Sequence, residues 1–183
     1  MEIITTHTNA DLDALASMVA AQKLYPCAVM VFPGTLLQNV EEFMALHKDT
    51  LNVKTVKDIV PALVKKMILV DTKSPGRLDK LAGLLQKPGV EVHIYDHHPR
   101  GVGDVRGNLE VVEMVGATTT LLIERIRERR LPVTPLEATV FALGIYEDTG
   151  SLTFSNTTPR DAEAVSYVLS QGAKLAVVAD FLG

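Results

Sequence analysis

Four short segments of this chain place aspartate or histidine directly after an apolar run. They span residues 7–13, 70–72, 95–99 and 146–150. Carboxylates and imidazoles next to buried segments cost free energy unless a partner compensates for their charge or polarity. A cluster of divalent metal ions is a common partner for such mixed ligand sets. The pattern therefore indicates a metal site built from segments that are far apart in the sequence.

Each segment also has a structural interpretation when it is considered alone. Asp11 could cap a helix that begins near Leu12, and Asp13 could interact with the dipole of that helix. Asp71 could cap the turn that follows it, and Asp148 could belong to an ordinary turn. This interpretation must hold in four places at once, and it does not explain why every segment follows an apolar run. We therefore favour the metal site.

The apolar pattern predicts an α/β fold. Short, nearly unbroken apolar runs predict strands buried on both faces, which is typical of a parallel sheet; they lie at residues 3–4, 28–32, 67–70, 90–95 and 109–112. Helical spacing separates them at residues 12–24, 36–47 and 78–85. We expect a mostly parallel sheet of about five strands with helices on both faces.

The C-terminal part of the chain is predicted to be helical, at residues 118–129, 135–145 and 159–170. Thr134 and Thr158 are expected N-caps, because each precedes a proline that suits the first helical turn. Residues 174–183 are apolar at helical spacing. This tail is expected either to dock on the core or to begin a linker helix of a longer protein.

Three of the four segments are expected at one edge of the sheet, because ligands of open α/β sheets bind at the carboxyl ends of the strands. His7 follows the first strand, Asp71 follows the strand at 67–70, and Asp96 and His97 end the strand at 90–95. Asp148 ends a helix, so its approach to this edge is inferred from its chemistry alone.

The ligand types suit two divalent cations. His7 and Asp11 can face one ion and Asp13 a second, with Asp71 bridging them and His97 and Asp148 completing the second. Four carboxylates offset two such charges, and without metal they would repel one another. Mixed oxygen and imidazole ligands favour Mn²⁺, with Fe²⁺, Co²⁺ and Zn²⁺ as alternatives, whereas oxygen alone would favour Mg²⁺. Two such ions promote displacement at phosphorus.

Composition fits a single globular domain over residues 1–183, with 47% hydrophobic and 22% charged residues. The formal net charge of −4 argues against a broad basic surface for duplex nucleic acid. The single cysteine, Cys27, fits a reducing cytoplasm and is expected to be buried. The N-terminus resembles neither a signal peptide nor a membrane span, so we expect no membrane partner.

These residues resemble the DHH phosphoesterase superfamily, which is named for the triplet found here as Asp96, His97 and His98. The matching motifs, in order along the chain, are His7 with Asp11 and Asp13, the strand ending at Asp71, the triplet, Gly116-Ala117-Thr118-Thr119, and Asp148-Thr149-Gly150. Each motif alone is weak, but the four that contain aspartate or histidine are highly specific in this order. Ala10 departs from the proline usual in the family, which should loosen the turn only slightly.

The resemblance implies a role for each motif residue. One Mn²⁺ would be held by His7, Asp11 and Asp71, and the other by Asp13, Asp71, His97 and Asp148. His98 would face the substrate phosphate as an electrophilic or acid group. Asp96 would orient His98 or His97.

Candidate substrate-binding residues are few. Arg100 follows the triplet, while Thr118 and Thr119 begin a helix whose N-terminus could bind an anion. Lys73 and Arg77 follow Asp71 and are expected to be exposed, solvated charges. The second domain that closes over the substrate in this family has no counterpart here. The chain most resembles N-terminal DHH modules fused to CBS domains and a nucleotidyltransferase of the poly(A) polymerase or CCA-adding type.

We therefore expect a divalent-metal-dependent phosphoesterase, with a small phosphorylated substrate or a short single-stranded nucleic acid as its partner. Candidate substrates are short oligonucleotides, a cyclic dinucleotide, a 3′-phosphorylated adenosine nucleotide, polyphosphate and pyrophosphate. The alternative is a non-catalytic metal- and nucleotide-binding module that regulates an RNA nucleotidyltransferase. The sequence leaves the oligomeric state open.

Overall fold

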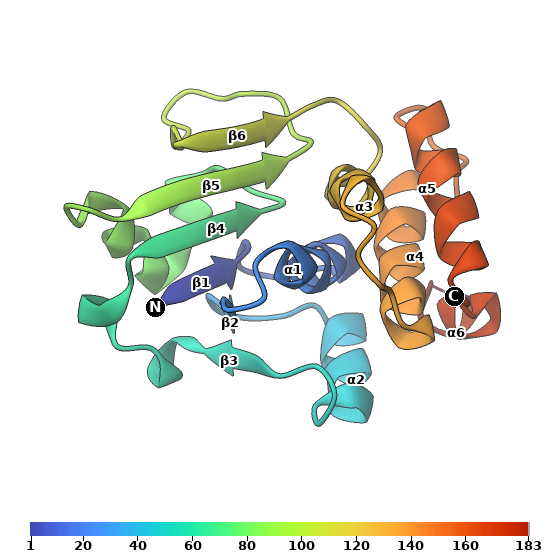
Figure 1. Ribbon diagram of the computed structural model, residues 1–183, viewed down its shortest axis with the longest axis horizontal. Coiled ribbons are helices and arrows are strands. Elements are labelled where there is room, and N and C mark those ends of the chain that lie inside the picture. Colours follow the sequence, from blue (N-terminus) through green and yellow to red (C-terminus); the bar gives the residue numbers. More distant parts are fainter. Residues whose placement is uncertain (183) are drawn as a thin grey trace.

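The computed structural model describes residues 1–182 and contains a six-stranded, all-parallel sheet. The strands are β1 (Glu2–Thr5), β2 (Val29–Phe32), β3 (Val53–Thr55), β4 (Lys66–Val70), β5 (Glu91–Asp96) and β6 (Leu109–Val112). Their order is β3-β2-β1-β4-β5-β6, and the arrows of β1, β4, β5 and β6 point the same way in Figure 1. The predicted fold class is confirmed. The sequence missed β3, which is three residues long and only partly buried.

The strand order reverses between β1 and β4. The chain moves outward from β1 to β2 and β3, and then returns to place β4 on the other side of β1. Ile3 pairs with Val29 on one side and with Met67 on the other. In open α/β sheets the crevice at such a reversal is where ligands bind. The segments that follow β1 and β4 therefore meet at this crevice.

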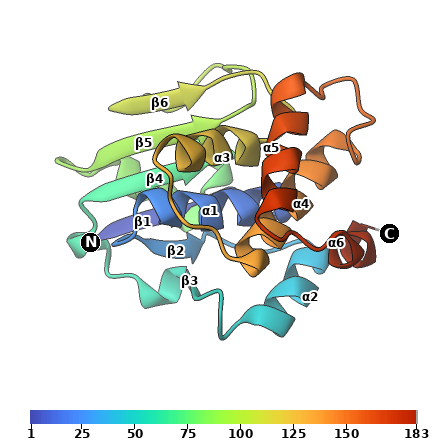
Figure 2. The same cartoon turned by 45° about the vertical axis from the view of Figure 1, so that its right-hand side comes forward.

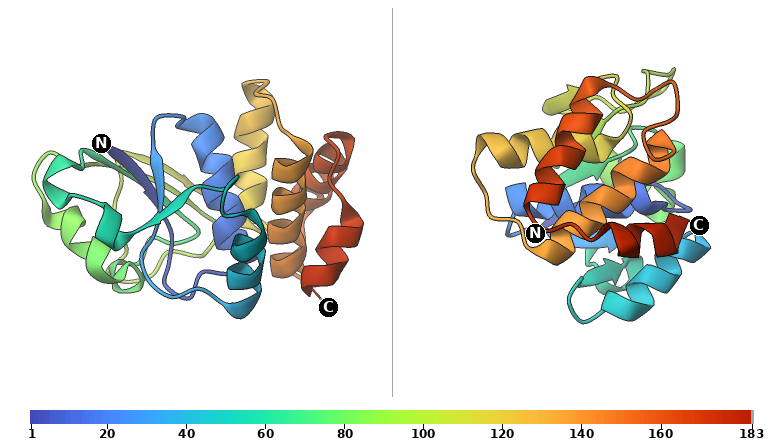
Figure 3. Two further views of the ribbon diagram at one scale, coloured as in Figure 1. Left: turned by 90° about the horizontal axis from the view of Figure 1, so that it is seen from below. Right: turned by 90° about the vertical axis from the view of Figure 1, so that its right-hand side faces the viewer.

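The α-helices lie on one face of the sheet (Figure 3). They are α1 (Leu12–Leu24), α2 (Gln38–His47), α3 (Thr118–Glu128), α4 (Pro135–Thr149), α5 (Pro159–Ser170) and α6 (Leu175–Leu182). The left view of Figure 3 shows α1 and α3 between the sheet and α4, with α5 and α6 outermost. Figure 2 shows α5 packing across α4.

The other face of the sheet is covered by 3₁₀ helices. The helix predicted at residues 78–85 is a 3₁₀ helix over Asp79–Gln86. The buried leucines at its N-cap and within it, Leu78, Leu81 and Leu84, recur every three residues. A 3₁₀ helix has three residues per turn, so this spacing places all three on one side, against the sheet. Helices therefore cover both faces, as expected.

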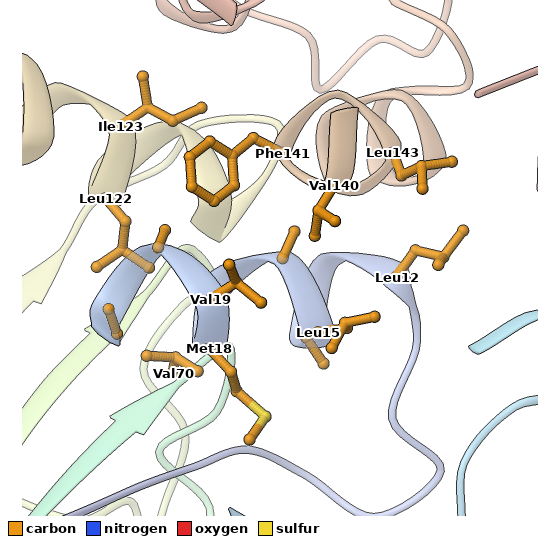
Figure 4. Packing of buried hydrophobic residues seen from close by; sticks show 14 of the residues in the cluster. Leu12, Leu15, Met18, Val19, Val70, Leu122, Ile123, Val140, Phe141 and Leu143 are labelled. Atoms are coloured by element: carbon orange, nitrogen blue, oxygen red, sulfur yellow. The ribbon is translucent and has the colours of Figure 1, made fainter. Parts of the chain in front are cut away.

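Helix α1 is buried on nearly every side, which explains its many small residues. Leu12, Leu15, Val19 and their neighbours pack between the sheet and the α3–α4 pair (Figure 4). Close approach of α4 depends on Gly144, where an added Cβ would lie 2.6 Å from Cβ of Ala16. Because real Cβ atoms do not approach so closely, glycine is required for this helix crossing.

The predicted N-caps Thr134 and Thr158 are both present, each in a capping box. Helix α4 runs to Thr149, past its predicted end at residue 145, and it stops at Gly150 in the left-handed conformation. The apolar tail forms α6 and packs on α4, while its last residue, Gly183, lies outside the described residues. Cys27 is exposed, so its predicted burial is wrong.

None of the helices within residues 1–182 combines the length and the apolar composition that a membrane crossing requires.

Candidate metal centre

The structure brings all six expected ligands together at the carboxyl edge of the sheet. One group of side chains contains His7, Asp11 and Asp71, and another contains Asp13, Asp71, His97 and Asp148. Within each group, one ligand atom from every residue lies within 4.8 Å of the others. Asp71 belongs to both groups, so the two candidate ion positions are adjacent.

His7 presents one ring nitrogen to this centre. Its Nδ1 lies 2.8 Å from the carbonyl oxygen of Thr8 and 3.1 Å from the guanidinium of Arg77, so Nε2 is the nitrogen that faces the centre. Nε2 lies 3.2 Å from Oδ2 of Asp71 and 3.8 Å from Oδ1 of Asp11. Asp11 also caps α1, because its Oδ1 accepts a 2.9 Å bond from the amide of Ala14. Asp11 thus caps the helix, as its structural interpretation predicted, and also belongs to the centre.

Asp71 is held between the two groups in a left-handed backbone conformation, with φ of 61°. Oδ2 faces His7, and Oδ1 lies 3.5 Å from Nε2 of His97. Oδ1 also accepts a 2.9 Å hydrogen bond from the hydroxyl of Thr118. A carboxylate with one oxygen toward each imidazole has the arrangement that a bridging ligand needs. Its strained backbone is of the kind found at functional sites.

Asp13 is bound by the N-terminus of α3, a helix more than 100 residues later in the chain. Its carboxylate accepts 3.0 Å bonds from the amides of Thr118 and Thr119 and a 2.6 Å bond from the hydroxyl of Thr119. Sequence reasoning expected this helix N-terminus to bind an anion, and in the structure that anion is Asp13. Both threonines are fully buried, and their expected contact with substrate stays a prediction.

His97 places a buried ring nitrogen among the carboxylates of the centre. Its Nδ1 donates a 2.8 Å bond to the carbonyl oxygen of Val115, so Nε2 is the nitrogen that faces the centre, and it carries a lone pair when the ring is neutral. Within residues 1–182, Nε2 is buried and has no hydrogen-bond partner. It lies 3.2 Å from Oδ2 of Asp148 and 3.8 Å from Oδ2 of Asp13. A buried polar atom rarely goes unsatisfied, and a divalent ion among these oxygens would satisfy it.

The electrostatics of the centre also fit a cation. Burial and, next to it, the charge of the nearby Asp148 carboxylate raise the pKa of Asp13 to about 7. Burial, together with Asp13 and Asp11, holds the pKa of Asp71 well above its usual range. Burial opposes protonation of His97, but the nearby carboxylates of Asp148 and Asp13 raise its pKa to about 9. Protons thus partly neutralise this set of carboxylates, a role that divalent cations would take over.

Asp96 lies beside the centre and binds two side chains. Its Oδ1 accepts a 2.6 Å bond from Nδ1 of His98, and its Oδ2 accepts a 2.7 Å bond from Nζ of Lys73. Burial would raise the pKa of Asp96, but these two contacts outweigh it and lower the pKa. The side chain of Lys73 is only 2% exposed, so the expectation of a solvated charge is wrong.

Two arginines near the motifs have defined partners. Arg100 forms an ion pair with Glu110 and donates to the carbonyl oxygen of Val105, so its side chain is engaged within the β5–β6 connection. Its contact with substrate therefore stays a prediction. Arg77 is exposed, but its guanidinium lies 3.1 Å from Nδ1 of His7, at the border of the centre.

Asp161 was not singled out by sequence reasoning, although it organises the loop before α3. Its fully buried carboxylate accepts bonds from the amide of Gly116 at 2.9 Å and from the hydroxyl of Thr120 at 2.6 Å. It also completes the capping box of α5 with Thr158. The capping box could be read from the sequence. The link to Gly116, where a Cβ would lie 2.5 Å from Cγ2 of Thr149, could not.

Comparison with known proteins agrees with this arrangement of motifs. The family described as "DHH family, N-terminal domain" matches residues 2–145. The chain belongs to the DHH family. The resemblance recognised in the sequence is thereby confirmed, and it covers both the sheet and most of α4.

Related DHH sequences come from larger proteins. The chain is 44% identical over its full length to an A-adding tRNA nucleotidyltransferase of Geobacter sulfurreducens and 36% identical over 95% of its length to one of Aquifex aeolicus. It spans only 21% and 20% of those proteins. It is also 32% identical, over 63% of its length, to 18% of the cyclic-di-AMP phosphodiesterase GdpP of Geobacillus thermodenitrificans.

Two solved structures share the DHH fold at low sequence identity. An exopolyphosphatase-related protein from Bacteroides fragilis superposes with a TM-score of 0.82 at 15% identity, covering 99% of this chain and 55% of the other. A putative family II inorganic pyrophosphatase from Methanococcus jannaschii gives a TM-score of 0.79 at 20% identity, covering 99% and 60%.

Proposed function

We propose that this chain is a divalent-metal-dependent phosphoesterase domain that hydrolyses a P–O bond of a phosphodiester or a phosphoanhydride. The observation that carries the proposal is the position of Asp71 between two adjacent ligand groups. The two groups are His7, Asp11 and Asp71, and Asp13, Asp71, His97 and Asp148. This mixture of carboxylates and imidazoles favours two Mn²⁺ ions, with Co²⁺, Fe²⁺, Zn²⁺ or Mg²⁺ as alternatives.

In this mechanism the chain supplies the metal ligands and one side chain that can donate a proton to the substrate. Two divalent ions, when bound, supply positive charge next to the phosphoryl oxygens and lower the pKa of attacking water. His98 is the group on the substrate side, because its side chain is 47% exposed while its Nδ1 is bound to Asp96. When the ring is protonated on both nitrogens, Nδ1 keeps its bond to Asp96 and Nε2 donates its proton to a phosphoryl or leaving-group oxygen.

The substrate class is part of the proposal. The relative named cyclic-di-AMP phosphodiesterase favours a phosphodiester such as a cyclic dinucleotide or a short oligonucleotide. A 3′-phosphorylated adenosine nucleotide, polyphosphate and pyrophosphate are the remaining candidates. The proposal includes a further domain of a longer protein that closes over the centre, because the chain spans about a fifth of its curated relatives.

A second function is favoured by one specific observation. The chain aligns along its whole length with part of an A-adding tRNA nucleotidyltransferase. In that setting the centre would bind metal and nucleotide without turnover, and would regulate or position RNA for the transferase. The intact set of ligands favours catalysis, because binding alone does not need two adjacent ion positions.

A panel of phosphorylated substrates with Mn²⁺ tests the proposal. Asp71→Asn should abolish turnover, since asparagine suits the left-handed backbone but cannot supply two anionic oxygens. Asp180→Asn is the matched control, because Asp180 is exposed on α6 and should leave turnover unchanged. Mn²⁺-dependent binding of a nucleotide without turnover would favour the second function. Absence of both Mn²⁺ binding and turnover would overturn both.

A further inference from the structure

Lys73 is a buried charge beside the metal centre that belongs to neither ligand group. Its Nζ lies 2.7 Å from Oδ2 of Asp96, 2.6 Å from the carbonyl oxygen of His98 and 4.0 Å from Oδ2 of Asp104. Burying an ion pair gains little stability, because the desolvation cost offsets much of the attraction. Stability alone therefore does not account for this lysine.

The contacts of Lys73 converge on His98 by two routes. One is direct, through the backbone carbonyl of His98. The other runs through Asp96, whose second oxygen accepts from Nδ1 of His98 at 2.6 Å and from its backbone amide at 3.3 Å. Backbone and ring of His98 are thus both fixed. Because Nδ1 carries the bonded proton, Nε2 is the nitrogen left for another partner.

The ring of His98 is fixed at the border of the centre. Its centroid lies 4.4 Å from that of His97, and its Nδ1 lies 4.0 Å from Oδ1 of Asp71. His98 also lines a pocket of about 150 Å³ together with Ser74 and Arg77. Ser74, Arg77 and His98 can each donate a hydrogen bond into this space, as a phosphoryl group requires. The carboxylates of Asp96 and Asp104 also line it.

We propose that Lys73 is a positioning residue that fixes the orientation and tautomer of His98 through Asp96 and the His98 carbonyl. The part of the proposal that concerns turnover rests on the proposed function, whereas the effect on the His98 ring does not. Lys73 also has a purely structural contact, since its own carbonyl accepts a 2.8 Å bond from the amide of Val105. Substituting the side chain leaves that backbone contact in place, so a variant isolates the role of the ammonium group.

The first experiment uses Lys73→Met in the full chain. It should lower kcat about tenfold or more, within the range typical for loss of such a neighbour, with KM and bound Mn²⁺ little changed. In a His98→Ala background, Lys73→Met should cost nothing further, because Lys73 acts through His98. Lys87→Met is the matched control. Lys87 also donates to backbone carbonyls, those of Pro61, Ala62 and Val64, but it lies just before β5, at the opposite edge of the sheet.

The second experiment measures the His98 ring without turnover. At a pH where the His98 ring is neutral, nitrogen NMR of the chain loaded with diamagnetic Zn²⁺ should show a single Nδ1-protonated tautomer in the wild type and a mixture in Lys73→Met. Lys73→Gln serves as a second variant if Lys73→Met fails to fold, because its amide keeps one donor near Asp96 but removes the charge.

The outcomes separate this proposal from the proposed function. A wild type that hydrolyses no phosphoester overturns the function, while the NMR result still decides the role of Lys73. An unchanged His98 tautomer in a folded Lys73 variant overturns the positioning role. A loss of kcat that is just as large in the His98→Ala background overturns it as well.

Discussion

The hydroxyl of Thr119 donates a 2.6 Å hydrogen bond to the carboxylate of Asp13, although the two residues are 106 positions apart. The backbone amide of Thr119 binds the same oxygen at 3.0 Å. Helix α3 packs against α1 and thereby holds the carboxylate of Asp13 in place. Helix α3 contributes no candidate metal ligand itself, but it determines the orientation of the candidate ligand Asp13.

Removing this hydroxyl tests its contribution. Thr119→Val should lower the free energy of unfolding by about 1.5–3 kcal/mol, as for hydrogen bonds to charged groups. It should weaken Mn²⁺ binding by roughly 10–100-fold, the usual cost of losing a group that orients a ligand. Urea unfolding and titration calorimetry give the two values. Thr157→Val is the control, because the buried Oγ1 of Thr157 has no partner among the described residues, and this change should be nearly neutral. Equal effects of the two substitutions would contradict the assigned role.

Gly144 should be intolerant of even one methyl group. In Gly144→Ala the new Cβ would lie 2.6 Å from Cβ of Ala16 and 2.7 Å from Oγ1 of Thr119. Relieving this overlap must move α4 away from α1, at a cost of about 1–3 kcal/mol, and displaces Asp148 on the same helix. Thermal unfolding and Mn²⁺ affinity should both fall. Gly83→Ala meets no atom within 4 Å and should leave both unchanged, so a harmless Gly144→Ala would show that the crossing tolerates more space than we infer.

Mn²⁺ should stabilise the folded chain, because it binds the assembled ligands and not the unfolded chain. At a hundredfold excess over Kd the gain is about 2.7 kcal/mol. The melting temperature should rise with Mn²⁺ in the wild type and in Asp180→Asn, and much less in Asp71→Asn. A melting temperature that does not change over a wide range of Mn²⁺ concentration would argue against a preassembled centre.

Metal-free protein should lose stability as pH rises from 5.5 to 8.5. The pKa of Asp13 is about 7 in the folded chain, against 3.8 for an unperturbed aspartate. As pH rises, the unfolded chain therefore releases this proton before the folded chain does, and the folded state loses stability up to about pH 7. The pKa of His97 is raised from 6.5 to about 9, so its stabilising contribution is complete below pH 6.5 and is lost as pH rises toward 9. Both groups act in the same direction, and the combined loss should be about 2 kcal/mol or more.

Saturating Mn²⁺ should reduce or reverse this pH dependence, because metal binding requires deprotonated ligands and therefore strengthens with pH. Urea unfolding at both pH values, with a chelator and with Mn²⁺, measures the difference. Stability of the metal-free chain that rises over this interval would mean that the carboxylates are not coupled as the structure indicates.

The sequence by itself determined the order of elements and much of the centre. Continuous apolar runs identified five of the six strands, because strands buried on both faces need apolar side chains at every position. The burial expected of the strand at 109–112 is wrong, since β6 is an edge strand that is exposed or only partly buried. Since parallel strands end at a common edge, His7, Asp71 and His97 could be placed together before any coordinates were known. The motif order then identified the family.

Only the tertiary structure decided how the remaining ligands are held. Asp148 lies in a helix, and its position depends on the close crossing of α4 and α1 that Gly144 permits. Thr119 binds Asp13, and Lys73 is buried against Asp96, because helix packing and a returning loop bring distant segments together. Local patterns in the sequence show which buried polar side chains require a polar or ionic partner. They do not encode which distant partner the packing supplies, because that depends on the contacts of the whole fold.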